Sequence, residues 1–404
     1  MNQPSDRLAR KNAVVLAMAQ AMGGALTSIT ISLGGLVGVY LLSQTGKLAT
    51  LPVTTMVVGT ACGTIPAGIL LAKIGKRPGF VLGAFLATLG GLVAFLAIHL
   101  GSFALYCAGT FLSGSSFAFT QQYRFAAAEG ASDAFRPKAI SMVLAGGIFA
   151  GVIGPQTVIA TKDLFLPVAY AGAYLAQAGL SLITIAILFF LYRPPSPTLK
   201  AADAPRGRPL HKVLTQPAVA LAILCALTSY AVMSLVMTAA PLAMRDCGFT
   251  TANAALGIQW HVIAMFAPSF FTGTLITRFG AQTISACGLL LLALCAATAL
   301  SGITLGHFYV ALILLGVGWN FGFIGGTAML TAALRPEDKA RAQAANDFIV
   351  FGCVACASLS SGVLFSSVGW ASINWAVFPV LTVPLVLIAV VLLTTNRRPH
   401  DRVA

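Results

Sequence analysis

The chain has 404 residues, of which 58% are hydrophobic and 8% are charged. Soluble domains carry about 25% charged residues, so this composition excludes a soluble globular protein and a disordered chain. The 24 Lys and Arg residues outnumber the 10 Asp and Glu residues, and the resulting net charge of +14 predicts a membrane protein with a basic cytoplasmic face.

Apolar runs recur along the whole chain. A helix needs about 20 such residues to cross the ~30 Å hydrocarbon core of a bilayer. Twelve runs of this kind can be drawn between charged or turn-forming segments. In chain order they are 13–42, 51–72, 80–100, 103–123, 139–160, 167–192, 218–242, 252–277, 282–301, 308–331, 343–366 and 372–394. The predicted fold class is an all-α polytopic membrane protein with 12 transmembrane helices.

The positive charges predict the orientation of these spans. With a cytoplasmic N-terminus, 21 of the 24 Lys and Arg residues fall on the inside, and only Lys47, Lys162 and Arg245 fall on the outside. Positive residues are retained on the cytoplasmic side, and a missed span would scramble this asymmetry. Both termini are therefore predicted to be cytoplasmic.

The longest polar stretch, residues 193–216, lies between the sixth and seventh spans. It contains five Pro and five Lys or Arg residues, a composition typical of a solvated linker. The predicted organisation is an N-terminal six-helix bundle (1–192), a cytoplasmic linker (193–217) and a C-terminal six-helix bundle (218–404).

The two predicted bundles share an internal repeat. Gly68, Lys73 and Gly75 after the second span match Gly273, Arg278 and Gly280 after the eighth span at a constant offset of 205 residues. Residues 114–117 match residues 318–321 more weakly, at an offset of 204. Paired six-helix bundles are the architecture of many secondary transporters, whose substrate site lies between the halves near the membrane midplane.

The loop after the second span, GILLAKIGKR, resembles the signature loop of the major facilitator superfamily, and the resemblance covers the whole chain. It implies that superfamily's fold, with two six-helix halves. Two positions depart from the pattern: Ala72 replaces the usual acidic residue of the loop, and Thr110 replaces the Arg that is usual in the fourth span of proton-linked members.

Few polar side chains lie inside the predicted spans. Of the five His residues, His261 alone lies well inside one, and Met265 follows it by one helical turn. Met233 and Met237 repeat this spacing in the seventh span. At 1.5 Å per residue, Met233 and His261 both lie about 14 Å from the outer ends of their helices.

Thioether and neutral imidazole groups are ligands that suit Cu(I), and a set without carboxylates would hold the ion weakly enough for transport. Methionine also fills gaps in apolar cores, so core packing is the alternative interpretation of the same spacing. Nothing in the sequence resembles a pair of catalytic carboxylates or a phosphate-binding loop, and no enzymatic activity or cofactor is expected.

An MxxxM motif in the seventh span with an HxxxM motif in the eighth resembles the CcoA-like copper importers, a branch of the major facilitator superfamily. The resemblance implies that Met233, Met237, His261 and Met265 bind copper. It also implies copper import into the bacterial cytoplasm across the inner membrane, in support of haem-copper oxidase assembly. The expected partners are the copper ion, the lipid bilayer and cytoplasmic copper acceptor proteins, with no nucleic acid.

Two alternatives remain open. A transporter of a flat organic solute such as a flavin or a drug could use an aromatic surface for stacking, with candidates Trp260, Trp319, Phe321 and Phe323. A non-transporting copper sensor or assembly factor could use the same fold. Asp347, near the inner end of the eleventh span, is a candidate for ion coupling or for a cap or gate.

Overall fold

The computed structural model describes residues 4–42, 47–129, 131–132, 135–194 and 208–396, and these residues form helices without a strand. The first half contains α1 (Pro4–Leu42), α2 (Leu51–Lys73), α3 (Lys76–His99), α4 (Phe103–Thr120), α5 (Tyr123–Ala128), α6 (Arg136–Thr161), α7 (Ala171–Ala186) and the π-helix η1 (Ile187–Leu191). The second half contains α8 (Leu210–Leu214), α9 (Pro217–Asp246), α10 (Thr251–Phe266), α11 (Ser269–Phe279), α12 (Ala281–Ser301), α13 (Leu305–Ala333) and α14 (Pro336–Asn396). Most of the predicted linker lies outside the described residues.

The helices match the predicted spans. Among the described residues, nine helices are long and apolar enough to cross a membrane, and the bent pair α10 and α11 makes a tenth. The 18-residue α4 packs against α2 and α3. The 61-residue α14 holds two spans, because Gly369 interrupts its helical backbone with φ of 79°. With α4 and the second part of α14, the twelve-helix arrangement is complete.

The eighth span differs from the continuous helix predicted over 252–277. It breaks between Phe266 and Ser269, and α10 and α11 meet at an angle of 42°. Pro268 lies at the break. Proline interrupts a helix because it has no N–H to donate and its ring clashes with the preceding turn. Asn320 of α13 stabilises the break by donating to the Met265 carbonyl at 2.8 Å.

The internal repeat is visible in the backbone. Gly75 and Gly280 both have φ of +86°, and each stands directly before the next helix, α3 or α12. Glycine adopts this left-handed region without the steric cost that a Cβ would bring. The two loops that match in sequence therefore turn the chain in the same way.

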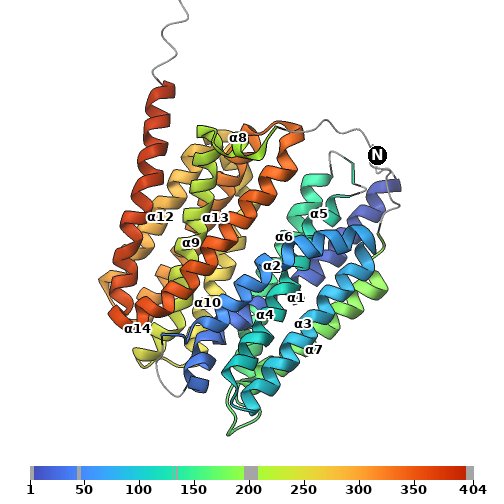
Figure 1. Cartoon of the computed structure of the whole chain (residues 1–404), viewed down its shortest axis with the longest axis vertical. Helices are drawn as coiled ribbons and strands as arrows, with labels where there is room; N and C mark the ends of the chain where they lie inside the picture. Colours follow the sequence, from blue (N-terminus) through green and yellow to red (C-terminus); the bar gives the residue numbers. More distant parts are fainter. Residues whose placement is uncertain (1–3, 43–46, 130, 133–134, 195–207, 397–404) are drawn as a thin grey trace, which may run out of the picture.

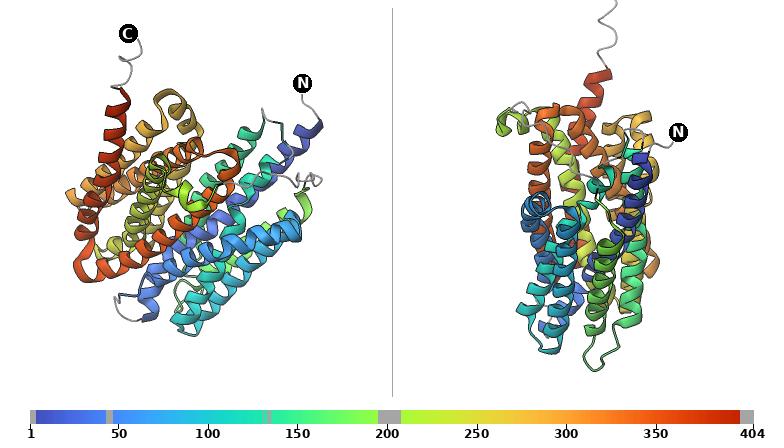
Figure 2. Two further views of the ribbon diagram at one scale, coloured as in Figure 1. Left: turned by 45° about the horizontal axis from the view of Figure 1, so that its top comes forward. Right: turned by 90° about the vertical axis from the view of Figure 1, so that its right-hand side faces the viewer.

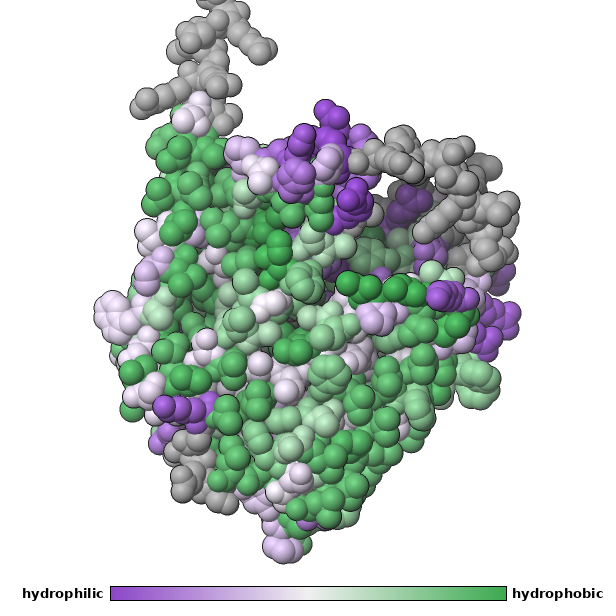
Figure 3. Space-filling view, viewed as in Figure 1, coloured by the Kyte–Doolittle hydropathy of each residue, from purple (hydrophilic) through white to green (hydrophobic). Residues whose placement is uncertain are grey.

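Figure 1 shows the two halves side by side, with the start of α1 and the end of α14 at the same end of the bundle. The left view of Figure 2 shows the first half, in blue and green, beside the second half, in yellow-green to red. Hydrophobic residues cover most of the face in Figure 3, and hydrophilic residues gather mainly at the end that carries α8. The positive-inside rule makes that end cytoplasmic.

The halves are in close contact on the outer side. Thr50 at the start of α2 donates to the Ser358 carbonyl of α14 at 3.3 Å. Gln156 of α6 donates to Gln259 of α10 at 2.8 Å. Leu242 of α9 packs directly against α1 at Gly35. The structure is therefore closed on its outer side.

Candidate functional site

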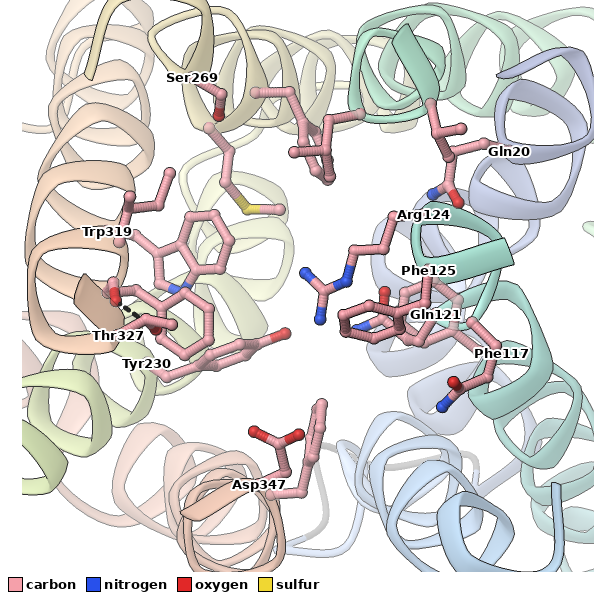
Figure 4. A pocket seen from close by; sticks show the side chains of 18 of the residues that line it. Gln20, Phe117, Gln121, Arg124, Phe125, Tyr230, Ser269, Trp319, Thr327 and Asp347 are labelled. Atoms are coloured by element: carbon pink, nitrogen blue, oxygen red, sulfur yellow. Dashed lines mark hydrogen bonds between the residues drawn. The ribbon is translucent and has the colours of Figure 1, made fainter. Parts of the chain in front are cut away.

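A cavity of about 740 Å³ lies between the halves, toward their cytoplasmic ends. Figure 4 draws 18 of the side chains that line it, and the lining comes from both halves. It is bordered by Arg124 of α5, by Thr331 near the end of α13 and by Asp347 in the first part of α14. Because the outer side is closed and the cavity lies at the inner ends, the protein adopts an inward-facing conformation.

The second half provides an aromatic wall. Trp319 and Phe323, one turn apart on α13, are stacked with ring centroids 5.1 Å apart and planes at 11°. Tyr230 of α9 meets both rings edge to face, at 5.4 Å and 5.3 Å. Phe351 of α14 contacts Tyr230 at 5.8 Å. Such a wall offers stacking area to a flat ligand, since aromatic pairs in offset or edge-to-face geometry attract beyond their buried area.

The first half provides amide and guanidinium groups. Gln20 of α1, Gln121 and Gln122 between α4 and α5, and Arg124 of α5 line the opposite wall. The short α5 is held in place by Tyr123, which is buried against Phe80 with ring centroids 4.8 Å apart. Arg124 points into the middle of the cavity in Figure 4.

Asp347 of α14 and Arg124 are the two charged residues among those that line the cavity. Asp347 accepts one hydrogen bond, from Asn346 at 3.1 Å, and lies across the cavity from Arg124 (Figure 4). Within the described part of the chain the two charges form no ion pair, although they interact electrostatically. Burial lowers the pKa of Arg124, and the negative charge of Asp347 opposes that change.

Two donors in the cavity wall lack partners. Nε of Arg124 and Nε1 of Trp319 are buried and make no hydrogen bond to the described residues. A buried donor without an acceptor costs about 1–3 kcal/mol. Both groups are therefore poised to donate to a ligand.

A second, narrower cavity of about 100 Å³ continues from the first toward the outer side. Met265 and Tyr230 line both cavities, and Met233 and Met237 of α9 line the narrow one together with Met56 of α2. Three of the four residues predicted as metal ligands therefore border the path between the halves.

His261, the fourth, does not line either cavity. It is fully buried, and its Nδ1 lies 2.9 Å from the Leu312 carbonyl of α13. The backbone of α10 at His261 runs against Gly316 of α13, and the backbone of α2 at Met56 runs against Gly114 of α4. His261 belongs to the packing of α10 on α13.

The predicted aromatic set is also divided. Trp319 and Phe323 line the large cavity, whereas Trp260 is 44% exposed and Phe321 packs edge to face on Phe271. Tyr230, the glutamines and Arg124 were not singled out in the sequence. In the sequence, Arg124 contributed only to the count of positive residues on the cytoplasmic side. Its position directly after a span was the signal that could have placed it at the cytoplasmic end of a cavity.

The chain is similar to known transporters. It matches the family model described as Major Facilitator Superfamily over residues 12–268 and 222–404. It is 48% identical over 359 residues to the riboflavin transporter RfnT of Brucella anthropi, with 89% of this chain and 90% of that protein covered. It is 28% identical over 371 residues to the uncharacterized MFS-type transporter YdeG of Bacillus subtilis, with 88% and 86% covered.

The fold is shared with the crystal structure of a mutant of the nucleoside transporter NupG. The TM-score is 0.71 at 14% sequence identity, with 95% of this chain and 98% of that chain covered. This likeness extends to the fold alone.

The interpretation as a CcoA-like copper importer is wrong, because a relative with 48% identity over nearly the whole chain is a riboflavin transporter. Of the four residues, the three methionines border the narrow cavity, whereas Nδ1 of the buried His261 lies against the Leu312 carbonyl of α13. Among the described residues, no three His, Cys, Asp or Glu side chains come together as a metal site. An MxxxM spacing inside a transporter arises equally from apolar side chains along a substrate path.

Proposed function

Because the chain belongs to the major facilitator superfamily and is a multi-pass protein of the bacterial inner membrane, we propose that it transports riboflavin or a closely related flavin by alternating access. The observation that carries this proposal is the cavity between the halves, with an aromatic wall on one side and amide and guanidinium groups on the other. The 48% identity to a riboflavin transporter supports the substrate class.

The cavity suits a flavin in size and chemistry. Sites for ligands of this size measure about 300–1,000 Å³ and combine aromatic walls with a few polar groups that fix orientation. Riboflavin has a flat three-ring system with an apolar dimethyl end, a polar end with two carbonyl groups, and a chain of hydroxyl groups. Trp319, Phe323 and Tyr230 can cover the flat system, and the amides of Gln20, Gln121 and Gln122 can both donate to and accept from the hydroxyl groups.

Transport follows from the inward-facing geometry. The large cavity opens to the cytoplasm, so a substrate bound there can exchange with that side. Contacts such as that between Thr50 and Ser358 close the outer side. When the halves rock, the narrow cavity lined by Met233, Met237 and Met265 widens toward the outside. These thioethers then form a flexible apolar path for the ring system.

The experiment is exchange of radiolabelled riboflavin into proteoliposomes that hold the purified protein and unlabelled riboflavin, which detects transport in either direction. We expect exchange above protein-free liposomes, and Trp319→Ala should lower its rate at subsaturating riboflavin about tenfold, since losing most of a buried aromatic contact costs about 1.5–3 kcal/mol. The matched control is Trp375→Ala, because Trp375 is 65% exposed on α14. Absence of exchange with folded, inserted protein contradicts the proposed function.

A further inference from the structure

We propose that Arg124 and Asp347 read one edge of the flavin ring system, with Arg124 donating to a ring carbonyl and Asp347 accepting the neighbouring imide N–H. This inference rests on the proposed function and deepens it, because it assigns the orientation of the substrate and the residues that select it. Under this assignment, Arg124 and Asp347 determine which ligands the site selects.

The first argument is the complementarity of the two side chains. A guanidinium group can only donate hydrogen bonds, and an ionised carboxylate can only accept them. Arg124 comes from the first half and Asp347 from the second, and both point into the same open space (Figure 4). Together they present a donor and an acceptor to a ligand that lies between the halves.

The second argument is their unused capacity. Nε of Arg124 is buried without a partner in the described structure. Asp347 receives a single hydrogen bond there, from Asn346. Because a carboxylate has room for several donors and charged groups are costly to leave unpaired, both side chains call for a polar ligand.

The third argument is the chemistry of the ring. The polar end of a flavin carries a carbonyl, an N–H and a second carbonyl in a row, so its complement is a donor, an acceptor and a donor. Arg124 and Asp347 supply a donor for one carbonyl and the acceptor for the neighbouring N–H, and both line the cavity. The apolar dimethyl end then extends toward apolar lining such as Phe266.

The hydroxyl chain is a less suitable partner for this pair. Each hydroxyl both donates and accepts, so neutral amides satisfy it without a buried charge. The glutamines of the first half provide those amides. The imide edge has a fixed order of acceptor and donor groups. It is therefore the part of the substrate that requires donor and acceptor side chains in a matching order.

The experiment compares two competitors of riboflavin exchange in proteoliposomes. Lumiflavin keeps the imide edge and lacks the hydroxyl chain, whereas 3-methylriboflavin keeps the chain and has no imide N–H. We expect lumiflavin to compete and 3-methylriboflavin to bind at least about tenfold more weakly than riboflavin, because the methyl group removes a hydrogen bond to a charged acceptor. Equal competition by riboflavin and 3-methylriboflavin overturns the inference while leaving riboflavin transport intact.

Variants of the pair make the test specific. Asp347→Ala should bind riboflavin more weakly and lose the discrimination against 3-methylriboflavin, whereas Asp347→Asn should keep part of it, because its amide oxygen still accepts. Arg124→Gln should weaken riboflavin and lumiflavin alike. Glu337→Gln is the charge-matched control, since Glu337 is exposed at the start of α14.

Variants that do not transport are measured by quenching of flavin fluorescence on the purified protein, which needs binding alone. Retained discrimination in Asp347→Ala overturns the assignment of the acceptor. Absence of riboflavin exchange and binding in the unmodified protein contradicts the proposed function itself, so the two failures are distinguishable.

Discussion

Thr54 of α2 and Ser358 of α14 are joined by a hydrogen bond of 3.2 Å between their hydroxyl groups, across the interface between the two halves. Thr50 lies one turn away on the same side and donates to the Ser358 carbonyl. The three side chains are buried, so this polar seam is part of the outer closure. Alternating access requires that it break and reform.

The seam predicts a variant that favours the outward-open state. A Cβ at Gly362 would lie 2.1 Å from Oγ1 of Thr50, so Gly362→Val should hold the outer side open. The readout is labelling of Met233→Cys, in a Cys247→Ser background, by a membrane-impermeant thiol reagent added outside. We expect labelling to accelerate about tenfold, as a shift of ~1.4 kcal/mol between the two states gives. An unchanged labelling rate would show that the contacts around Thr50 do not keep the outer side closed.

Close packing of α6 on α10 predicts a second outcome. A Cβ at Gly151 would lie 2.8 Å from Cγ1 of Val262, so Gly151→Ala should destabilise the inward-facing state by about 1–3 kcal/mol, as overpacking does. Gly179→Ala on α7 is the matched control, because no atom lies within 4 Å of its added Cβ. Riboflavin exchange should fall in the first variant and persist in the second. Equal effects would show that the glycines matter only for helix propensity.

His261 and Met265, one turn apart on α10, should respond differently to replacement by Ala. His261→Ala removes the contact to the Leu312 carbonyl and leaves a void, so thermal denaturation should show a loss of about 1–3 kcal/mol. Its riboflavin affinity should change less than about twofold, far below 1 kcal/mol. Met265→Ala should instead weaken binding, because Met265 lines both cavities. A loss of affinity without a loss of stability in His261→Ala would place the imidazole in the binding site.

The break in the eighth span depends on a buried amide. Asn320 donates to the Met265 carbonyl at 2.8 Å and to Ser269 at 2.7 Å, and it accepts from Thr272 at 2.6 Å. Asn320→Leu should therefore lower the melting temperature and the exchange rate together, because each buried polar group left unpaired costs about 1–3 kcal/mol.

Asn374→Leu is the matched control for that variant. Asn374 is equally buried but makes one hydrogen bond, to the Trp370 carbonyl. It should cost less stability than Asn320→Leu. An equal or larger loss would mean that Asn320 does not hold the break between α10 and α11.

The sequence by itself determined the class of protein and the course of its helices. Span count and orientation follow from hydropathy and charge, which are local properties that add along the chain. The repeat was also visible, because a left-handed turn before a helix requires glycine at Gly75 and Gly280 alike.

The tertiary structure decided which polar side chains face the substrate path. A span that is apolar on all sides gives no periodic signal that separates a lipid face from a packed face or a cavity face. The sequence did not show that His261 is buried against the Leu312 carbonyl of α13, or that Arg124, which counted there as a topology signal, lines the cavity. The packing of helices distant in sequence determines where each side chain points, and it places Arg124 and Asp347, 223 residues apart in the chain, on the same cavity.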